Sequence, residues 1–369
     1  MPADAGLLAV EMLLAAFAGG ALGGALGPLP SLSLAGVVVA LGELSSPGPG
    51  SGAGTGAGGA ANGGIGRLAD AGSGAGIDVG LVSQRLTALV GLGPALGPHV
   101  AFAGGVAAAA YAGRKGYLDD GSEYHRAKQV ATGLGSRPDV LVVGGAFGVV
   151  GYWLAQLSIR LNLPWEPVAA SVVLSGFLHR IVFGYPLVGS PAGGLLDMTP
   201  YEEGERRMRT DGSDADGSLA GRYLVEPWLP AHYGWANVTL LGLVVGVFGG
   251  FLALATGSYY FAFGLAAATL AFACAGVDRF PVTHHMALPA SIAALALPEV
   301  GVAVAILAAG AFGVVAGLVG EVSQRVLYAH ADTHLDPSFV SILVTSLLIA
   351  ALDVAGVLSQ SAIPTAGLV

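Results

Sequence analysis

The sequence predicts an all-α integral membrane protein, with about ten transmembrane helices arranged as two inverted five-helix repeats. Three observations support this fold class: an apolar composition, apolar runs of bilayer length, and motifs that recur in two halves. The chain is 54% hydrophobic and 11% charged, with a mean hydropathy of +0.72, whereas soluble proteins carry about 25% charged residues. Runs such as 139–159 and 300–320 have about the 20 residues that span a bilayer.

The apolar runs place five helices in each half, with small residues on their faces as in closely packed membrane helices. The first repeat, residues 1–189, has helices at about 7–27, 30–44, 97–113, 139–160 and 167–188. A polar connector, residues 190–235, leads to the second repeat, residues 236–369, with helices at about 236–256, 258–276, 284–298, 300–326 and 337–358. The Gly-rich stretch 45–77 is a flexible loop. Residues 80–96 form either a re-entrant or an interfacial helix.

Several motifs recur in the same order in both halves. The sequence GAFGVV occurs at 145–150 and again at 310–315. In that register Gln156 matches Glu321 and Arg160 matches Arg325. After a five-residue insertion, Glu166-Pro matches Asp336-Pro, and upstream His99 matches His285. Five helices is an odd number, so the second repeat enters the membrane from the opposite side, as in many secondary transporters.

The charges indicate an orientation and a location. Most of the fifteen Lys and Arg residues fall in the connections between helices 3 and 4 and between helices 5 and 6. The positive-inside rule then places these connections in the cytoplasm and both termini outside a cell membrane. The net charge of −9 and the Asp-rich stretch 209–218 resemble proteins of salt-loving microbes, although a GC-rich genome explains the Ala, Gly and Arg bias equally well.

Histidines at two helix starts are the first candidates for a substrate or ion pathway. His99 opens the third helix, and His284 and His285 open the eighth, with prolines nearby that interrupt helices. Imidazoles beside broken helices form a proton or ion site, because histidine titrates near neutral pH. The alternative is that they are interfacial residues bonded to loops.

The matched ends of the fourth and ninth helices hold the second set of pathway candidates, which are Gln156, Arg160, Glu321 and Arg325. The i,i+4 spacing favours a salt bridge between Glu321 and Arg325, and a gate or a contact with substrate is the alternative. Glu166 and Asp336 are expected to be carboxylate helix starts, since an acid before proline complements the helix dipole.

The last pathway candidates are His179 and Arg180, inside the fifth helix. Charged residues inside membranes are functional candidates. A buried arginine also needs an acid, which Glu11 or Glu43 is expected to supply, and otherwise it reaches the interface.

The stretch HADTHLDPSF, residues 330–339, alternates four possible metal ligands. Asp336-Pro belongs to the repeated helix start, so we expect His330, Asp332 and His334 to lie in a longer loop near the membrane surface and not to bind a metal. Cys274, the single cysteine, excludes disulfides within the chain.

These observations favour a transporter or permease that moves a small solute or ion by alternating access. The chain lacks the motifs of hydrolases, P-loop proteins and calcium loops, so we expect no enzyme activity, no cofactor and no nucleic-acid partner. The expected partners are membrane lipid and the solute, with a homodimer or membrane complex possible. An ion channel, a structural membrane subunit and an intramembrane metal-dependent enzyme remain the alternatives.

Overall fold

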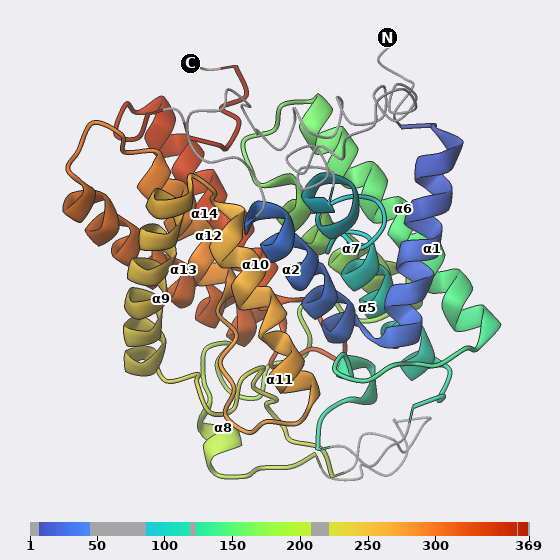
Figure 1. Ribbon diagram of the computed structural model, residues 1–369. Helices are drawn as coiled ribbons and strands as arrows, with labels where there is room; N and C mark the ends of the chain where they lie inside the picture. Colours follow the sequence, from blue (N-terminus) through green and yellow to red (C-terminus); the bar gives the residue numbers. More distant parts are fainter. Residues whose placement is uncertain (1–6, 45–85, 119–122, 208–220, 360, 368–369) are drawn as a thin grey trace.

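The computed structural model describes residues 7–44, 86–118, 123–207, 221–359 and 361–367, and these form an all-helical fold without β-strands (Figure 1). The first half contains α1 (Val10–Leu26), α2 (Pro28–Leu44), the π-helix η1 (Leu86–Gly91), α5 (Ala101–Arg114), the 3-10 helix η2 (Arg126–Lys128), α6 (Pro138–Arg160) and α7 (Pro167–Phe183). The connector holds the short helix α8 (Thr199–Glu202). The second half contains α9 (Trp235–Thr256), α10 (Tyr260–Ala268), α11 (Leu270–Cys274), α12 (His284–Leu295), α13 (Val302–Leu327) and α14 (Pro337–Val354).

Each of the ten apolar ranges contains a helix, and the range 258–276 contains two, α10 and α11. The fifth helix ends before the predicted residue 188, because Gly184 adopts a left-handed conformation, with φ of 72°, and caps α7. Of the ambiguous range 80–96, the described part is η1 followed by turns. The Gly-rich stretch 45–77 lies outside the described residues.

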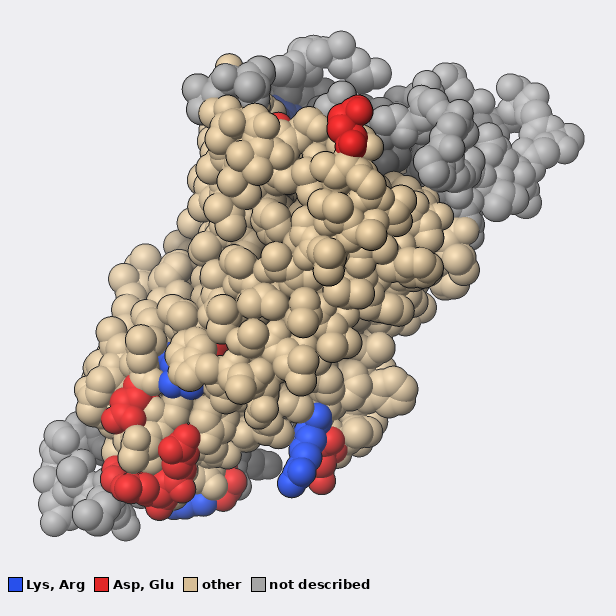
Figure 2. Space-filling model, turned by 90° about the vertical axis from the view of Figure 1, so that its left-hand side faces the viewer, with Lys and Arg blue, Asp and Glu red and all other residues tan. Residues whose placement is uncertain are grey.

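Four helices, α6, α9, α13 and α14, are long and apolar enough by length and composition to cross a membrane. Large apolar side chains on the outer faces of α9 and α13, such as Leu240 and Leu307, are more than 60% exposed. On the face in Figure 2, charged side chains gather toward the lower end and the band above them is uncharged. Exposed apolar surface of this extent is typical of a protein that contacts lipid.

The two halves share one pattern of helix packing. In the first half α6 packs against α1, α5 and α7, and α1 packs against α5. In the second half α13 packs against α9, α12 and α14, and α9 packs against α12. The halves meet through α2 with α10 and through α7 with α14. Contacts among α1, α5, α6 and α7 thus follow the same pattern as those among α9, α12, α13 and α14.

Glycines at the matched motif positions bring two of these helix pairs into backbone contact. A Cβ atom on Gly148 of α6 would lie 2.8 Å from the Cα of Gly20 in α1. A Cβ atom on Gly313 of α13 would lie 2.7 Å from the Cα of Gly246 in α9. Gly148 and Gly313 occupy the same place in the GAFGVV motif, so both copies of the motif place a glycine against a neighbouring helix.

The core helices α5 and α12 are too short to cross a bilayer. With 14 and 12 residues, α5 and α12 are about 21 Å and 18 Å long at 1.5 Å per residue. Both begin inside the protein, next to the start of α14. The ring of Phe339 in α14 lies 5.5 Å from the ring of Phe102 in α5 and 5.6 Å from the ring of His284 in α12.

Candidate functional site

The starts of α5, α12 and α14 meet in the interior and form an aromatic and imidazole cluster, which consists of Phe102, His284, His285, His334 and Phe339. The imidazole of His334 lies 5.9 Å from the Phe102 ring, and the two rings of His284 and His285 are 5.9 Å apart. All five side chains are buried.

The histidines predicted from the sequence are buried polar groups with unused hydrogen-bonding capacity. Both ring nitrogens of His284 and the Nδ1 atoms of His99 and His285 have no hydrogen-bond partner in the part of the chain that the structure describes. Buried polar groups are usually paired, so these nitrogens are available to a proton, a water molecule or a solute. His99 lies against α6 and approaches Gly151 through its carbonyl oxygen.

No metal centre assembles from these groups. Among the described residues, no three His, Cys, Asp or Glu side chains lie close enough together to hold a metal ion. The intramembrane metal enzyme therefore has no ligand set in the described part of the chain.

The two acidic helix starts have matching geometry. Glu166 Oε2 accepts a hydrogen bond from the Ala169 amide at 2.6 Å, and Asp336 Oδ1 accepts one from the Phe339 amide at 3.0 Å. The backbone N–H of Glu166 also donates to Ser346 Oγ in α14. Both carboxylates are 4% exposed, so they neutralise helix starts within the protein.

The two histidines of the loop before α14 lie inside the protein, and the position of this loop near the membrane surface stays a prediction. His330 and His334 are at most 1% exposed. His334 Nε2 lies 3.1 Å from Asp336 Oδ2, and its ring packs edge-on against Tyr328. The residues inserted before Asp336 therefore pack inside the protein beside the start of α14.

The expectation that an acid pairs with Arg180 is wrong for the described residues. The guanidinium donates to the carbonyl oxygens of Leu187, Leu327 and Thr333 and to the Thr333 hydroxyl. His179 Nε2 shares the same hydroxyl. These hydrogen bonds use the donors of the guanidinium, and through them Arg180 connects α7 to the loop between α13 and α14.

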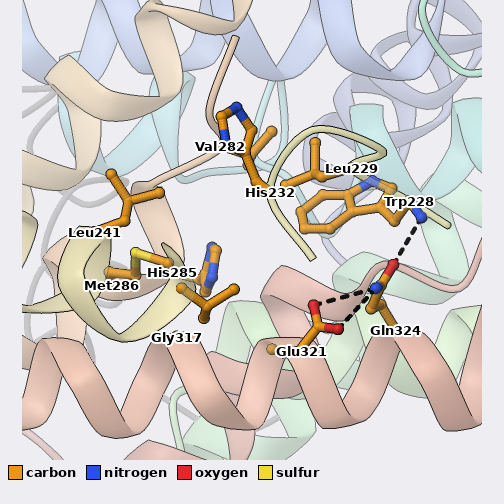
Figure 3. A pocket seen from close by; sticks show the side chains of 12 residues that line it. Trp228, Leu229, His232, Leu241, Val282, His285, Met286, Gly317, Glu321 and Gln324 are labelled. Carbon is orange, nitrogen blue, oxygen red and sulfur yellow. Dashed lines mark hydrogen bonds between the residues drawn. The ribbon is translucent and has the colours of Figure 1, made fainter. Parts of the chain in front are cut away.

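Glu321 and Arg325 form the i,i+4 ion pair, with 2.6 Å between Arg325 Nε and Glu321 Oε1. Glu321 also borders a pocket between α9, α12, α13 and the connector, together with His285 and Gln324 (Figure 3). Their counterparts in the first half, Gln156 and Arg160, are half-buried at the end of α6. The structure thus brings Glu321 next to His285.

A buried ionic network at the lower end of the molecule was not predicted. Lys128 Nζ lies 2.7 Å from Glu226 Oε2, and Arg222 lies 3.5 Å from Glu226 and 2.8 Å from Asp332. The Lys128 ammonium also lies 4.4 Å from the centre of the Tyr328 ring. These residues come from the loop before α6, the connector and the loop before α14, so sequence spacing gave no sign of the network.

His125 borders this network and makes stability depend on pH. Burial lowers its pKa to about 3 and the neighbouring Arg222 also lowers it, while Asp332 acts in the opposite direction. Below pH 6.5 the unfolded chain binds a proton that the folded chain does not, so stability falls as pH falls from about 6.5 toward 3. The slope is at most about 1.4 kcal/mol per pH unit, because a single proton is involved.

We therefore expect His125→Asn to flatten the acid branch of the pH profile of thermal unfolding. The Ala127 amide donates a hydrogen bond to His125 Nδ1. The Asn side chain retains an acceptor for this amide. An unchanged acid branch in this variant would show that other groups control the loss of stability.

The fold and the site define an all-helical protein with candidate membrane-spanning helices and buried polar groups where its two halves meet. The chain matches the model of a family of unknown function, DUF7973, over residues 2–366, and it belongs to that family. Comparison with curated proteins and with solved structures gave no match.

Proposed function

We propose that the protein is a multi-pass transporter of the cell membrane, built from two inverted five-helix repeats, that moves a small solute or ion by alternating access. The observation that carries this proposal is the geometry of the two contacts between the halves. Each contact joins a helix to its own counterpart, α7 to α14 and α2 to α10.

Both of these contacts are antiparallel. The Glu166 amide at the start of α7 bonds Ser346 in the third turn of α14, while Gly176, further along α7, packs against Leu335 just before α14. In the other pair, Gly36 of α2 packs against Ala267 of α10, and Gly264 of α10 packs against Ala40. Antiparallel contacts between equivalent helices are expected for a two-fold axis in the membrane plane, as in inverted-repeat transporters.

The short helices α5 and α12 support the same function. Discontinuous helices whose ends lie near the bilayer midplane form the solute sites of many transporters, because their ends leave backbone groups available to a ligand. Here both short helices begin beside unpaired imidazoles. His284 and His285 are the residues that we assign to the pathway, and Arg180 is left out because its donors are occupied.

Uptake into proteoliposomes tests the proposal. Purified protein is reconstituted and offered labelled small solutes, with and without an imposed pH gradient. We expect saturable uptake and counterflow of at least one solute above the level of protein-free vesicles. Flux without saturation or counterflow would indicate a channel, and absence of flux across solutes of each charge class would contradict transport.

A further inference from the structure

Glu166 places a buried carboxyl group where both contacts between the halves meet. The residue is 4% exposed and caps α7. Its amide donates to Ser346 Oγ of α14 at 2.9 Å, and its Oε1 lies 3.5 Å from the Tyr260 hydroxyl at the start of α10. Since α14 and α10 contact the first half through α7 and α2, Glu166 touches the second half in both places.

No basic side chain compensates this carboxyl group in the described part of the chain. Neither Arg160, in the last turn of α6, nor any other described Lys, Arg or His forms an ion pair with Glu166. The two other buried glutamates of the described ranges, Glu226 and Glu321, have basic partners at 2.7 Å and 2.6 Å. Buried carboxylates are normally paired, because transfer of a charge out of water is costly.

The helices packed around Glu166 offer phenols and acids at this level. From α10 it faces Tyr260, and Tyr259 and the α2 residue Glu43 lie next to that phenol. The only titratable residue of α14 is Asp353, in its last turn, and α5 has none before Tyr111. Ionisation of Glu166 therefore places an unpaired negative charge in the interior, and a buried acid in such surroundings binds a proton instead.

The matching acid of the second half has a basic partner. Asp336 caps α14 through Oδ1, and its Oδ2 lies 3.1 Å from His334 Nε2. Glu166 caps α7 through Oε2 in the same way, but its other oxygen faces the Tyr260 hydroxyl. A hydroxyl that donates to a carboxylate lies about 2.5–2.7 Å from it, so the separation of 3.5 Å fits a neutral carboxyl group. The capping bond needs only one acceptor oxygen, as neutral caps show.

We propose that Glu166 is a proton-binding site, whose Oε1 carries a proton in this conformation and releases it when the halves move relative to each other. Its neighbours in α10 and α14 belong to the other half, so such a movement changes the surroundings of the carboxyl group. On release the O–H bond breaks, the proton passes to water and the carboxylate remains. Acidic residues inside membranes form proton relays in pumps and transporters. That this proton drives solute movement rests on the proposed function.

Infrared spectroscopy of the purified full-length protein in detergent tests proton binding without any solute. A protonated carboxyl group has a carbonyl stretch that a carboxylate lacks, and isotopic labelling of glutamate assigns that band to glutamic acid. We expect the band at neutral pH in the unaltered protein, its disappearance as the pH is raised, and its loss in Glu166→Gln. Absence of the band at neutral pH would overturn the proposal without any variant. A band of full intensity in a folded Glu166→Gln protein would overturn it as well.

Glu321→Gln is the matched control for the band. Glu321 is 6% exposed, close to the 4% of Glu166, but its carboxylate lies 2.6 Å from Arg325 Nε. We expect the band to keep its intensity in this variant, and its loss would assign the proton to Glu321 instead. Tyr260→Phe removes the hydroxyl next to Oε1 and should shift the frequency of the band. An identical spectrum in Tyr260→Phe would contradict the assignment of the proton to Oε1.

Flux measurements separate this inference from the proposed function. We expect an imposed pH gradient to accelerate solute uptake by the unaltered protein, and we expect this acceleration to be lost in Glu166→Gln. If the band is present but no solute enters proteoliposomes, the transport proposal fails and the proton site stands. If a solute is transported but the band is absent, the proton site fails and transport stands. Acceleration that persists in Glu166→Gln would contradict a role of this proton in coupling.

Discussion

Gly148→Ala and Gly313→Ala are each expected to destabilise the protein by about 2–3 kcal/mol, and by similar amounts. The new Cβ atom would lie 2.4 Å from the Ala16 carbonyl oxygen in the first case and 2.2 Å from the Gly242 carbonyl oxygen in the second. Backbone atoms cannot rotate away as a side chain does, so the helix pairs α1–α6 and α9–α13 must separate. The midpoint of thermal unfolding in detergent measures both effects.

Gly301→Ala is the matched control. Gly301 precedes α13, has a φ of −61°, and would give its Cβ atom open space. We expect no measurable loss of stability in this variant. A loss of stability in Gly148→Ala without a comparable loss in Gly313→Ala would contradict equivalent packing in the two halves.

Removal of Glu226 has the second large expected effect. Its carboxylate lies 2.7 Å from Lys128 Nζ and accepts a hydrogen bond from the His125 amide, and the residue is 2% exposed. Glu226→Ala leaves the buried Lys128 without its acid, and loss of one partner of a buried pair costs about 3–5 kcal/mol. A correspondingly lower midpoint of thermal unfolding is the expected result.

Replacing both partners tests the cause of that loss. The Lys128→Met, Glu226→Leu double variant removes both charges, so it should recover most of the lost stability. Arg222 keeps its contact with Asp332 at 2.8 Å in this background. If the double variant is as unstable as Glu226→Ala, the uncompensated charge of Lys128 is not the cause of the stability lost in Glu226→Ala.

The positions of the helices were predictable because the signal is local. Apolar runs, the Pro that follows each acidic cap and the repeated GAFGVV motif lie within short windows of the sequence. The capping bonds of Glu166 and Asp336 follow from the same windows. The short length of α5 and α12 was less evident from the sequence. The residues just before these helices are not helical, and their conformation depends on tertiary contacts.

The polar contacts were predictable only where partners lie one helical turn apart. Glu321 and Arg325 are four residues apart and form the expected pair. The acceptors of Arg180 are mainly carbonyl oxygens up to 153 residues away, and a carbonyl has no signature in the sequence. The ionic network around Glu226 and the place of Trp228 in the pocket depend on the fold for the same reason.

Labelling of single cysteines in sealed vesicles tests the proposed opposite orientation of the two repeats. In a Cys274→Ala background, Tyr117→Cys marks the loop between α5 and α6, and Glu299→Cys marks the equivalent loop between α12 and α13. Both positions are exposed. We expect a membrane-impermeant thiol reagent to label these two cysteines from opposite sides of the membrane. Labelling of both from the same side would contradict it.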